Sequence, residues 1–200
     1  MAKKLIVVGL GDSTTAGTPK FMSPLEAPPE GVGDPESQYC YWMMKAHPEW
    51  MVLNKGVNGQ RSDEILSRFD RDVVAEKPKA VIVLAGVNDI YQGRTVKAVE
   101  QNLESMYTLA EDNGIVPVAA TVLPYNTARA KERSSIREVN AWVEAACRAP
   151  GRLFCDTNLA VRDKDAADFL ASTRDGLHPD VDGYRRMGEA LTAALERAGY

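Results

Sequence analysis

The sequence predicts an α/β fold, a three-layer sandwich in which helices cover both faces of a five-stranded parallel sheet. Five short runs rich in Val, Leu and Ile alternate with segments whose apolar residues repeat every three or four positions. The clearest runs are continuously apolar, which is typical of parallel strands buried on both faces. Strand and helix in alternation require crossover connections, which are almost always right-handed, and these place helices on both sides of the sheet.

The expected strands are residues 5–10, 52–54, 80–85, 116–121 and 153–155. The expected helices carry apolar stripes with a period near 3.6, which we expect to face the sheet. The stripes consist of Ile65, Leu66, Phe69 and Val73; of Val96, Val99, Leu103, Met106 and Ala110; of Ile136, Val139, Trp142, Val143 and Ala146; and of Tyr184, Met187, Leu191 and Leu195.

Local signals mark where some segments begin and end. Ser62 or Asp63 is expected to cap the helix around residue 65, and Asn113 with Gly114 is expected to end the next one. Residues 18–36 interrupt the alternation, because five prolines and two glycines oppose regular structure there. We expect one domain over residues 1–200, with this stretch as a loop insertion.

Composition narrows the classes of function. The 200 residues include 24 Lys and Arg against 28 Asp and Glu, a net charge of −4 that argues against nucleic acid and anionic membranes as partners. No apolar run approaches the roughly 18 residues of a membrane span. The apolar start of the chain is too short for a secretion signal, and three widely spaced cysteines suit a reducing compartment. We expect a cytoplasmic protein without membrane insertion.

Candidate chemistry lies in the loops that follow the strands, because open parallel sheets bind ligands beyond the carboxyl ends of their strands. Asp175 and His178 are three positions apart, so the carboxylate can reach and orient the imidazole. Ser13 follows the first strand and is the best-placed nucleophile, since a serine hydroxyl needs such an oriented base. The alternative for Ser13 is a helix cap.

An acyl-transfer serine also needs hydrogen-bond donors for the oxyanion of its tetrahedral intermediate. The Ser13 N–H, the Gly59 N–H and the Asn88 side-chain amide are available in these loops. Taken singly, Gly59 is better explained by an ordinary turn and Asn88 by an ordinary loop asparagine. The conjunction of nucleophile, base, orienting carboxylate and donors favours a serine hydrolase.

These residues resemble the SGNH hydrolases, also called the GDSL lipase and esterase family. Four blocks occur in the family's order, at residues 11–13, 54–59, 86–89 and 175–178. The resemblance implies Ser13 as nucleophile, His178 as general base and then acid, and Asp175 as the residue that orients it. It also implies an oxyanion hole of Ser13, Gly59 and Asn88, and no cofactor or metal.

The family resemblance extends to the fold and has one visible departure. It implies a flavodoxin-like sheet with strand order 2-1-3-4-5, in agreement with the order of elements above. Thr14 stands where the family name has leucine, a non-catalytic position that can change the pocket wall. Gly56 lies in the same block as Gly59, and we choose Gly59 for its place at the end of that block.

The implied activity is a serine esterase or acylhydrolase that cleaves a small-molecule carboxylic ester, with short acyl or acetyl groups preferred. Simple esters, lysophospholipids, thioesters and acetylated sugars all fit the family. Tyr125 follows the fourth strand and is expected to line the acyl or alcohol pocket, with a packed loop tyrosine as the alternative. The sequence makes no prediction of oligomeric state.

Two other functions share this scaffold. Residues 13–18 are rich in hydroxyl groups and resemble the phosphate loop of FMN-binding flavodoxins, although that function leaves Asn88, Asp175 and His178 without a role. A non-catalytic ligand-binding module would be expected to have lost part of the constellation, which is complete here. A metal hydrolase is disfavoured because the two histidines, His47 and His178, are far apart in the chain.

Overall fold

The computed structural model describes residues 5–17 and 34–200. The strands are β1 (Leu5–Gly11), β2 (Trp50–Gly56), β3 (Ala80–Leu84), β4 (Val116–Ala120) and β5 (Leu153–Cys155). The α-helices are α1 (Ser13–Ala16), α2 (Tyr39–Ala46), α3 (Ser62–Ser67), α4 (Phe69–Asp72), α5 (Val87–Tyr91), α6 (Val96–Asp112), α7 (Ala130–Ala146), α8 (Thr157–Val161) and α9 (Val181–Arg197). The 3-10 helices are η1 (Pro35–Ser37) and η2 (Val74–Glu76).

The five strands form one parallel sheet in the order β2-β1-β3-β4-β5, which confirms the predicted topology. Val7 of β1 lies opposite Val52 of β2 on one side and Ala80 of β3 on the other. Every residue of β3 is buried, as its continuous apolar run predicts. The order places β1 and β3 next to each other at the point where the winding of the sheet reverses.

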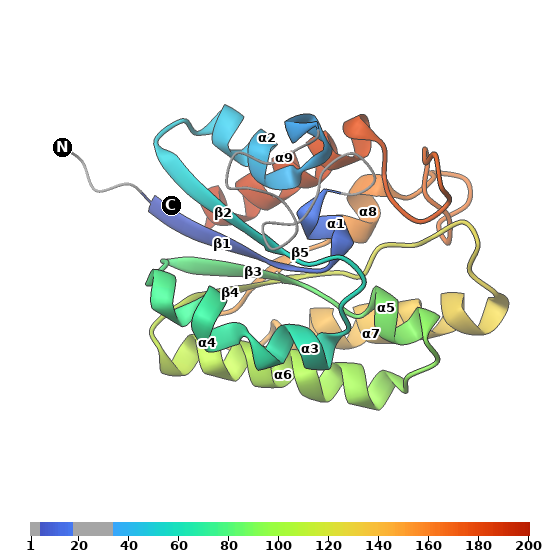
Figure 1. The fold of residues 1–200 in the computed structure, drawn as a ribbon, viewed down its shortest axis with the longest axis horizontal. Helices are drawn as coiled ribbons and strands as arrows, with labels where there is room; N and C mark the ends of the chain where they lie inside the picture. The colour runs from blue at the N-terminus through green and yellow to red at the C-terminus, as the bar shows by residue number, and fades with distance from the viewer. Residues whose placement is uncertain (1–4, 18–33) are drawn as a thin grey trace.

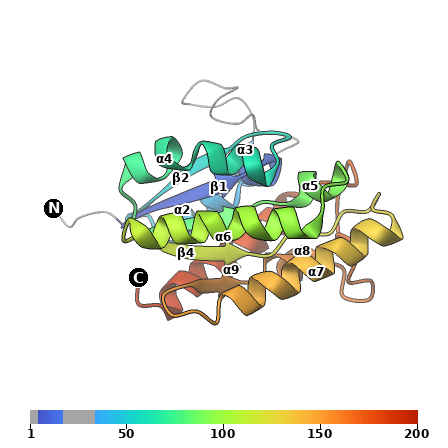
Figure 2. The ribbon, with the colours of Figure 1, turned by 90° about the horizontal axis from the view of Figure 1, so that it is seen from below.

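Helices cover both faces of the sheet (Figure 1). In the view turned by 90°, α3, α4, α6 and α7 lie in front of the strands, and α9 lies behind them (Figure 2). Alternate residues of each strand enter two separate cores. Val8 and Val83 pack with the side of α3, α4, α6 and α7, and Val7 and Ile82 pack with the side of α2, α8 and α9. This alternation is the period of a strand with apolar layers on both faces.

The long helices follow the predicted stripes. Val99, Leu103, Met106 and Ala110 of α6 are buried, as are Tyr184, Met187, Leu191 and Leu195 of α9. Helix α6 ends at Asp112, and Gly114 adopts the left-handed conformation with φ +68°. The predicted stop at residues 113–114 is therefore confirmed, for the reason expected of a glycine at that position.

The helix expected around residues 65–73 is divided, and its predicted cap is wrong. Arg68 separates α3 from α4, and its side chain turns inward to donate to main-chain carbonyls near the ends of β2 and β1. Arg61 occupies the cap position, and its N–H donates to Glu64 Oε2 at 2.9 Å. Ser62 is the first helical residue, and its hydroxyl donates to Asp89 instead.

The expected loop at residues 18–36 falls for the most part outside the described residues. Its last residues belong to η1, where the Asp34 side chain accepts a hydrogen bond from the Glu36 N–H. A proline at the first position of this short helix fits, because that position needs no N–H donor. Within the described ranges, no helix has the length and apolar composition to cross a membrane.

Candidate active site

The candidate site lies at the carboxyl ends of β1 and β3, where the winding of the sheet reverses. Ser13 begins α1 directly after β1, and Asn88 lies in the first turn of α5 after β3. Figure 1 shows α1 and α5 at the same end of the sheet. A crevice at such a switch point is the general ligand position of open parallel sheets.

Ser13 and His178 are in hydrogen-bond contact although 165 positions separate them. The Ser13 Oγ lies 2.8 Å from His178 Nε2. Both side chains are largely buried: Ser13 is 8% exposed and the His178 side chain 12%. This is the geometry in which an imidazole can accept the proton of a serine hydroxyl.

Asp175 holds the other side of the imidazole. Its Oδ2 lies 2.7 Å from His178 Nδ1, and its Oδ1 accepts the N–H groups of Leu177 and His178 at 2.8 and 2.9 Å. Partial removal from water raises the pKa of Asp175 on its own, but the hydrogen bonds from the His178 ring and the two N–H groups lower it to about 2. The carboxylate is therefore ionised at neutral pH and suited to stabilise an imidazolium.

Asp12 is the cap residue of α1, the short helix that begins at Ser13. It caps α1 by accepting the Thr14 N–H at 2.9 Å, so the cap residue is Asp12 and the alternative assignment of Ser13 as a cap is wrong. Asp12 is 1% exposed, and burial raises its pKa to about 6 against the lowering effects of the Thr14 hydrogen bond and His178.

The second glycine block separates into a packing glycine and a pocket glycine. A Cβ on Gly56 would lie 2.1 Å from the backbone nitrogen of Ala16, so Gly56 permits the close approach of β2 to α1. Gly59 has φ +75°, and apart from its own residue and its two chain neighbours no atom lies within 4 Å of the position a Cβ would take. Gly59 lines the same pocket as Ser13, Asn88 and His178.

Asn88 is held by the segment that carries Gly59. Its Nδ2 donates one hydrogen bond, to the Gln60 carbonyl at 3.0 Å. A side-chain amide has two N–H bonds, so Asn88 can donate a second one to a ligand. The predicted oxyanion donors thus lie in one pocket with the nucleophile.

The pocket that contains Ser13 has a volume of about 300 Å³. Tyr125, the predicted lining residue, contributes to its wall and is fully buried. Tyr91, which the sequence analysis missed, stands over Tyr125 with an edge-to-face contact of 6.1 Å between ring centroids and is 59% exposed. No periodic pattern marks Tyr91, since it ends the short helix α5 and buries little surface.

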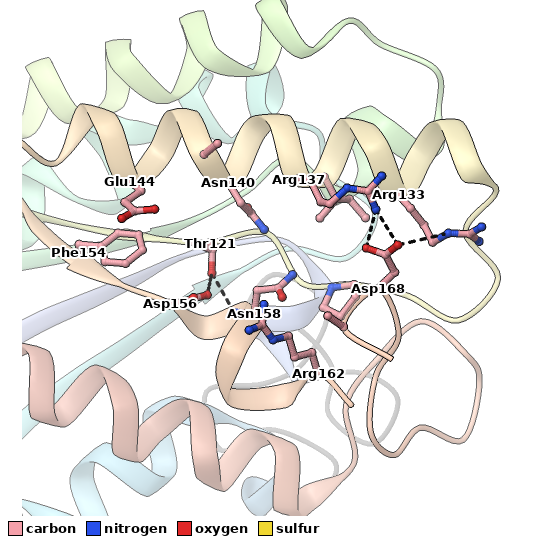
Figure 3. Close-up of a pocket in the computed structure, with 14 residues that line it drawn as sticks. Thr121, Arg133, Arg137, Asn140, Glu144, Phe154, Asp156, Asn158, Arg162 and Asp168 are labelled. Atoms are coloured by element: carbon pink, nitrogen blue, oxygen red, sulfur yellow. Dashed lines mark hydrogen bonds and ion pairs between the residues drawn. The ribbon is translucent and has the colours of Figure 1, made fainter. Parts of the chain in front are cut away.

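A second pocket, of about 260 Å³, lies between α7, α8 and the loop after α8 (Figure 3). Arg137 binds Asp168 across it at 2.6 Å, and Thr121 donates to Asp156 at 2.8 Å. The groups that line it contain no serine or histidine. In the described part of the chain, no group of three or more His, Cys, Asp or Glu side chains is arranged to hold a metal ion.

The arrangement around Ser13 can perform nucleophilic acyl transfer. It combines a hydroxyl, a base in contact with it, a carboxylate that orients the base, and donors in the same pocket. Sequence reasoning missed the buried Arg68, which hydrogen-bonds Gln60 and the end of β1. An arginine within an apparent helix gives no signal of its own, because arginine is an ordinary helix former.

Comparison with known proteins gives the same family. The model of the GDSL-like lipase/acylhydrolase family matches residues 10–186. The chain is similar to the structure of a lipolytic protein of the G-D-S-L family from Desulfitobacterium hafniense DCB-2, with a TM-score of 0.78, 28% identity, and coverage of 94% of this chain and 98% of that one.

Two curated proteins are also similar to this chain, each over a smaller share of it. An acetylxylan esterase of Geobacillus stearothermophilus is 23% identical over 70% of this chain and 69% of its own length. An uncharacterized lipoprotein of Bacillus subtilis (strain 168), YqeF, is 29% identical over a stretch of 79 residues. This stretch covers 36% of this chain and 32% of YqeF. The match of the family model over most of the residues decides the assignment: the chain belongs to the GDSL-like lipase/acylhydrolase family, a family of carboxylic ester hydrolases.

Proposed function

We propose that the protein hydrolyses small carboxylic esters through an acyl-serine intermediate on Ser13. The observation that carries the proposal is the contact chain from Ser13 Oγ to His178 Nε2, at 2.8 Å, and from His178 Nδ1 to Asp175 Oδ2, at 2.7 Å. Gly59 and Asn88 lining the same pocket support it.

In the first half-reaction, Ser13 Oγ attacks the ester carbonyl carbon while His178 Nε2 takes the hydroxyl proton. The C–O bond to the alcohol then breaks, and the imidazolium gives its proton to the departing oxygen. Asp175 remains ionised throughout, as its low pKa requires, and stabilises the charged ring.

In the second half-reaction, His178 removes a proton from water, which attacks the acyl-serine carbonyl. Collapse of the second tetrahedral intermediate releases the carboxylic acid and returns the proton to Ser13. In both steps the negative charge on the carbonyl oxygen is received by the N–H groups of Ser13 and Gly59 and by the Asn88 amide, so these donors stabilise the transition states.

The proposed substrates carry a short acyl group, with acetylated sugars as the first class to test. A pocket of about 300 Å³ must accept both sides of the ester bond, which leaves little room for a long chain. The exposed ring of Tyr91 at this pocket offers an apolar surface for a bulkier alcohol. The similar acetylxylan esterase of Geobacillus stearothermophilus acts, by its name, on acetylated xylan.

The test is labelling with a fluorophosphonate probe together with turnover of p-nitrophenyl acetate, for the wild type and Ser13→Ala. Loss of both in a folded Ser13→Ala variant is the expected result. Ser37→Ala, which changes another buried serine, in η1, is the matched control and should keep both. A folded wild type that neither labels nor turns over contradicts the proposal.

The preferred length of the acyl group is tested with p-nitrophenyl esters from acetate to octanoate. The preference for the alcohol part of the ester is tested with acetylated and deacetylated xylo-oligosaccharides. We expect kcat/KM to fall as the acyl chain lengthens beyond butyrate. A maximum at octanoate would contradict the short-acyl assignment while leaving the acyl-serine mechanism intact.

A further inference from the structure

Gln60 is linked to two of the residues of the candidate oxyanion hole, Gly59 and Asn88. It follows Gly59 in the chain, and its carbonyl accepts the hydrogen bond from Asn88 Nδ2 at 3.0 Å. The two predicted donors that lie outside α1 are therefore attached to one residue, one by a peptide bond and one by a hydrogen bond. Gln60 itself does not line the pocket.

The side chain of Gln60 is hydrogen-bonded to the buried side chain of Arg68. Arg68 Nε donates to Gln60 Oε1 at 2.7 Å, and the arginine side chain is only 5% exposed. The same guanidinium donates to the Lys55 carbonyl at 2.8 Å and to Asp72 at 2.7 Å. A planar guanidinium with several bonds in fixed directions has little freedom, so it defines where Gln60 lies.

Arg68 also connects Gln60 to the strand that presents the nucleophile. Its second terminal nitrogen donates to the Gly11 carbonyl at 2.8 Å, two residues before Ser13. The Val57 N–H donates to the same carbonyl at 3.1 Å, and the Gln60 N–H closes the turn by donating to the Val57 carbonyl at 3.4 Å. The turn that carries Gly59 is thus bonded to Gly11 directly at Val57 and through Arg68 at Gln60.

We propose that Gln60 is a positioning residue of this active site. Because Arg68 holds it in place, Gln60 sets the Gly59 N–H and the Asn88 amide at hydrogen-bond distance from the oxyanion of the tetrahedral intermediate that forms on Ser13. The inference rests on the proposed function. Donors aimed at a transition state act through placement, so a small displacement lowers kcat more than it changes substrate binding.

The test compares Gln60→Leu with Gln60→Glu in the full chain. Leucine is similar in size to glutamine but has no acceptor for Arg68. Glutamate places a carboxylate oxygen where Gln60 has its amide Oε1, so the hydrogen bond from Arg68 Nε can still form. We expect Gln60→Leu to lower kcat on p-nitrophenyl acetate about tenfold with KM within about twofold, less than the loss of a whole donor. We expect Gln60→Glu to recover kcat to within about threefold of the wild type.

A transition-state analogue separates positioning from folding. Phenylboronic acid becomes tetrahedral when Ser13 Oγ bonds to boron and the hydroxyl proton passes to His178. Its dissociation constant should rise about tenfold in Gln60→Leu, in parallel with the fall in kcat. Arg71→Met, which alters the exposed partner of Asp72 on α4, is the control and should leave kcat and the dissociation constant unchanged.

The outcomes are distinguishable. Wild-type kcat in Gln60→Leu, equal losses in the leucine and glutamate variants, or a rise in KM alone would overturn the role of Gln60 while Ser13 labelling continues. Failure of Ser13 labelling in the wild type would instead remove the proposed function. Gln60→Ala carries the same predictions if Gln60→Leu does not fold at the assay temperature.

Discussion

Asp89 holds Ser62 through both of its carboxylate oxygens. Oδ2 accepts the Ser62 N–H at 2.8 Å and Oδ1 accepts its hydroxyl at 2.7 Å, with both residues buried. Asn102 of α6 donates to the same hydroxyl oxygen at 2.9 Å. Asp89 follows Asn88 and Ser62 lies three positions after Gly59, so this contact joins the two loops that carry the predicted oxyanion donors.

Ser62→Ala should lower the free energy of unfolding by about 1–3 kcal/mol, because it removes one donor from a buried carboxylate and one acceptor from Asn102. Urea unfolding at pH 7 measures this loss. The matched control is Ser67→Ala, the same substitution at an exposed position of the same helix, which should change stability by less than about 0.5 kcal/mol. Equal effects of the two substitutions would show that the Asp89 contact contributes nothing.

Asn88→Ala should reduce kcat by about 10² to 10³, the usual cost of losing one oxyanion donor. The substitution leaves Ser13 and His178 in place, so we expect the variant to stay folded, with an unfolding midpoint close to that of the wild type. Asn113→Ala, at the exposed end of α6 on the opposite edge of the sheet, is the control with full activity. A kcat near that of the wild type in folded Asn88→Ala would remove Asn88 from the oxyanion hole.

Asp175→Asn should cost less kcat than the loss of Ser13 or His178. In a triad that acts as one unit, removing the nucleophile or the base lowers kcat by a factor of about 10⁶. Removing the orienting carboxylate lowers it by a factor of about 10⁴. The asparagine amide can donate to His178 Nδ1 and so favour the wrong tautomer, while the oxyanion donors stay in place. The kcat values of Asp175→Asn, Ser13→Ala and His178→Ala on p-nitrophenyl acetate test the order, and an inverted order contradicts the assigned roles.

The fold and the position of the site follow from local features of the sequence. Continuous apolar runs and helical stripes predicted the strands and the layered α/β fold, and the family resemblance implied the strand order. The residues that follow the strands predicted that Ser13, Gly59, Asn88 and His178 would meet. Their meeting could be anticipated because the carboxyl ends of parallel strands share one edge of the sheet. The structure places all four around one pocket.

The supporting contacts could not be predicted, since they join side chains that are remote in sequence and that local patterns assign to other roles. Ser62 looked like a helix cap, and in the structure its hydroxyl serves Asp89. Arg68 lies within the segment expected to form one helix, and in the structure its side chain is buried and donates to carbonyls of β1 and β2. Periodicity reports which face of a helix is apolar, but not which polar group a buried side chain will meet.

The buried carboxyl of Asp12 gives the protein a distinct dependence of stability on pH. Burial raises the pKa of Asp12 from its ordinary 3.8 to about 6. Between these values the folded protein binds more protons at this group than the unfolded chain does, so its contribution to stability is complete below about pH 4 and is lost as pH rises through about 6. The difference in pKa corresponds to roughly 3 kcal/mol.

Asp12→Asn removes this titration and keeps an oxygen that can accept the Thr14 N–H. The free energy of unfolding of the wild type, relative to Asp12→Asn, should therefore fall by roughly 2 kcal/mol between pH 4 and pH 7. Urea unfolding at intervals across this range measures the difference, and Asp70→Asn, at an exposed position of α4, controls for the loss of one carboxyl group. A difference that stays constant with pH would mean that Asp12 titrates alike in the folded and unfolded chains. In that case its burial beside Ser13 would impose no charge penalty on the folded state.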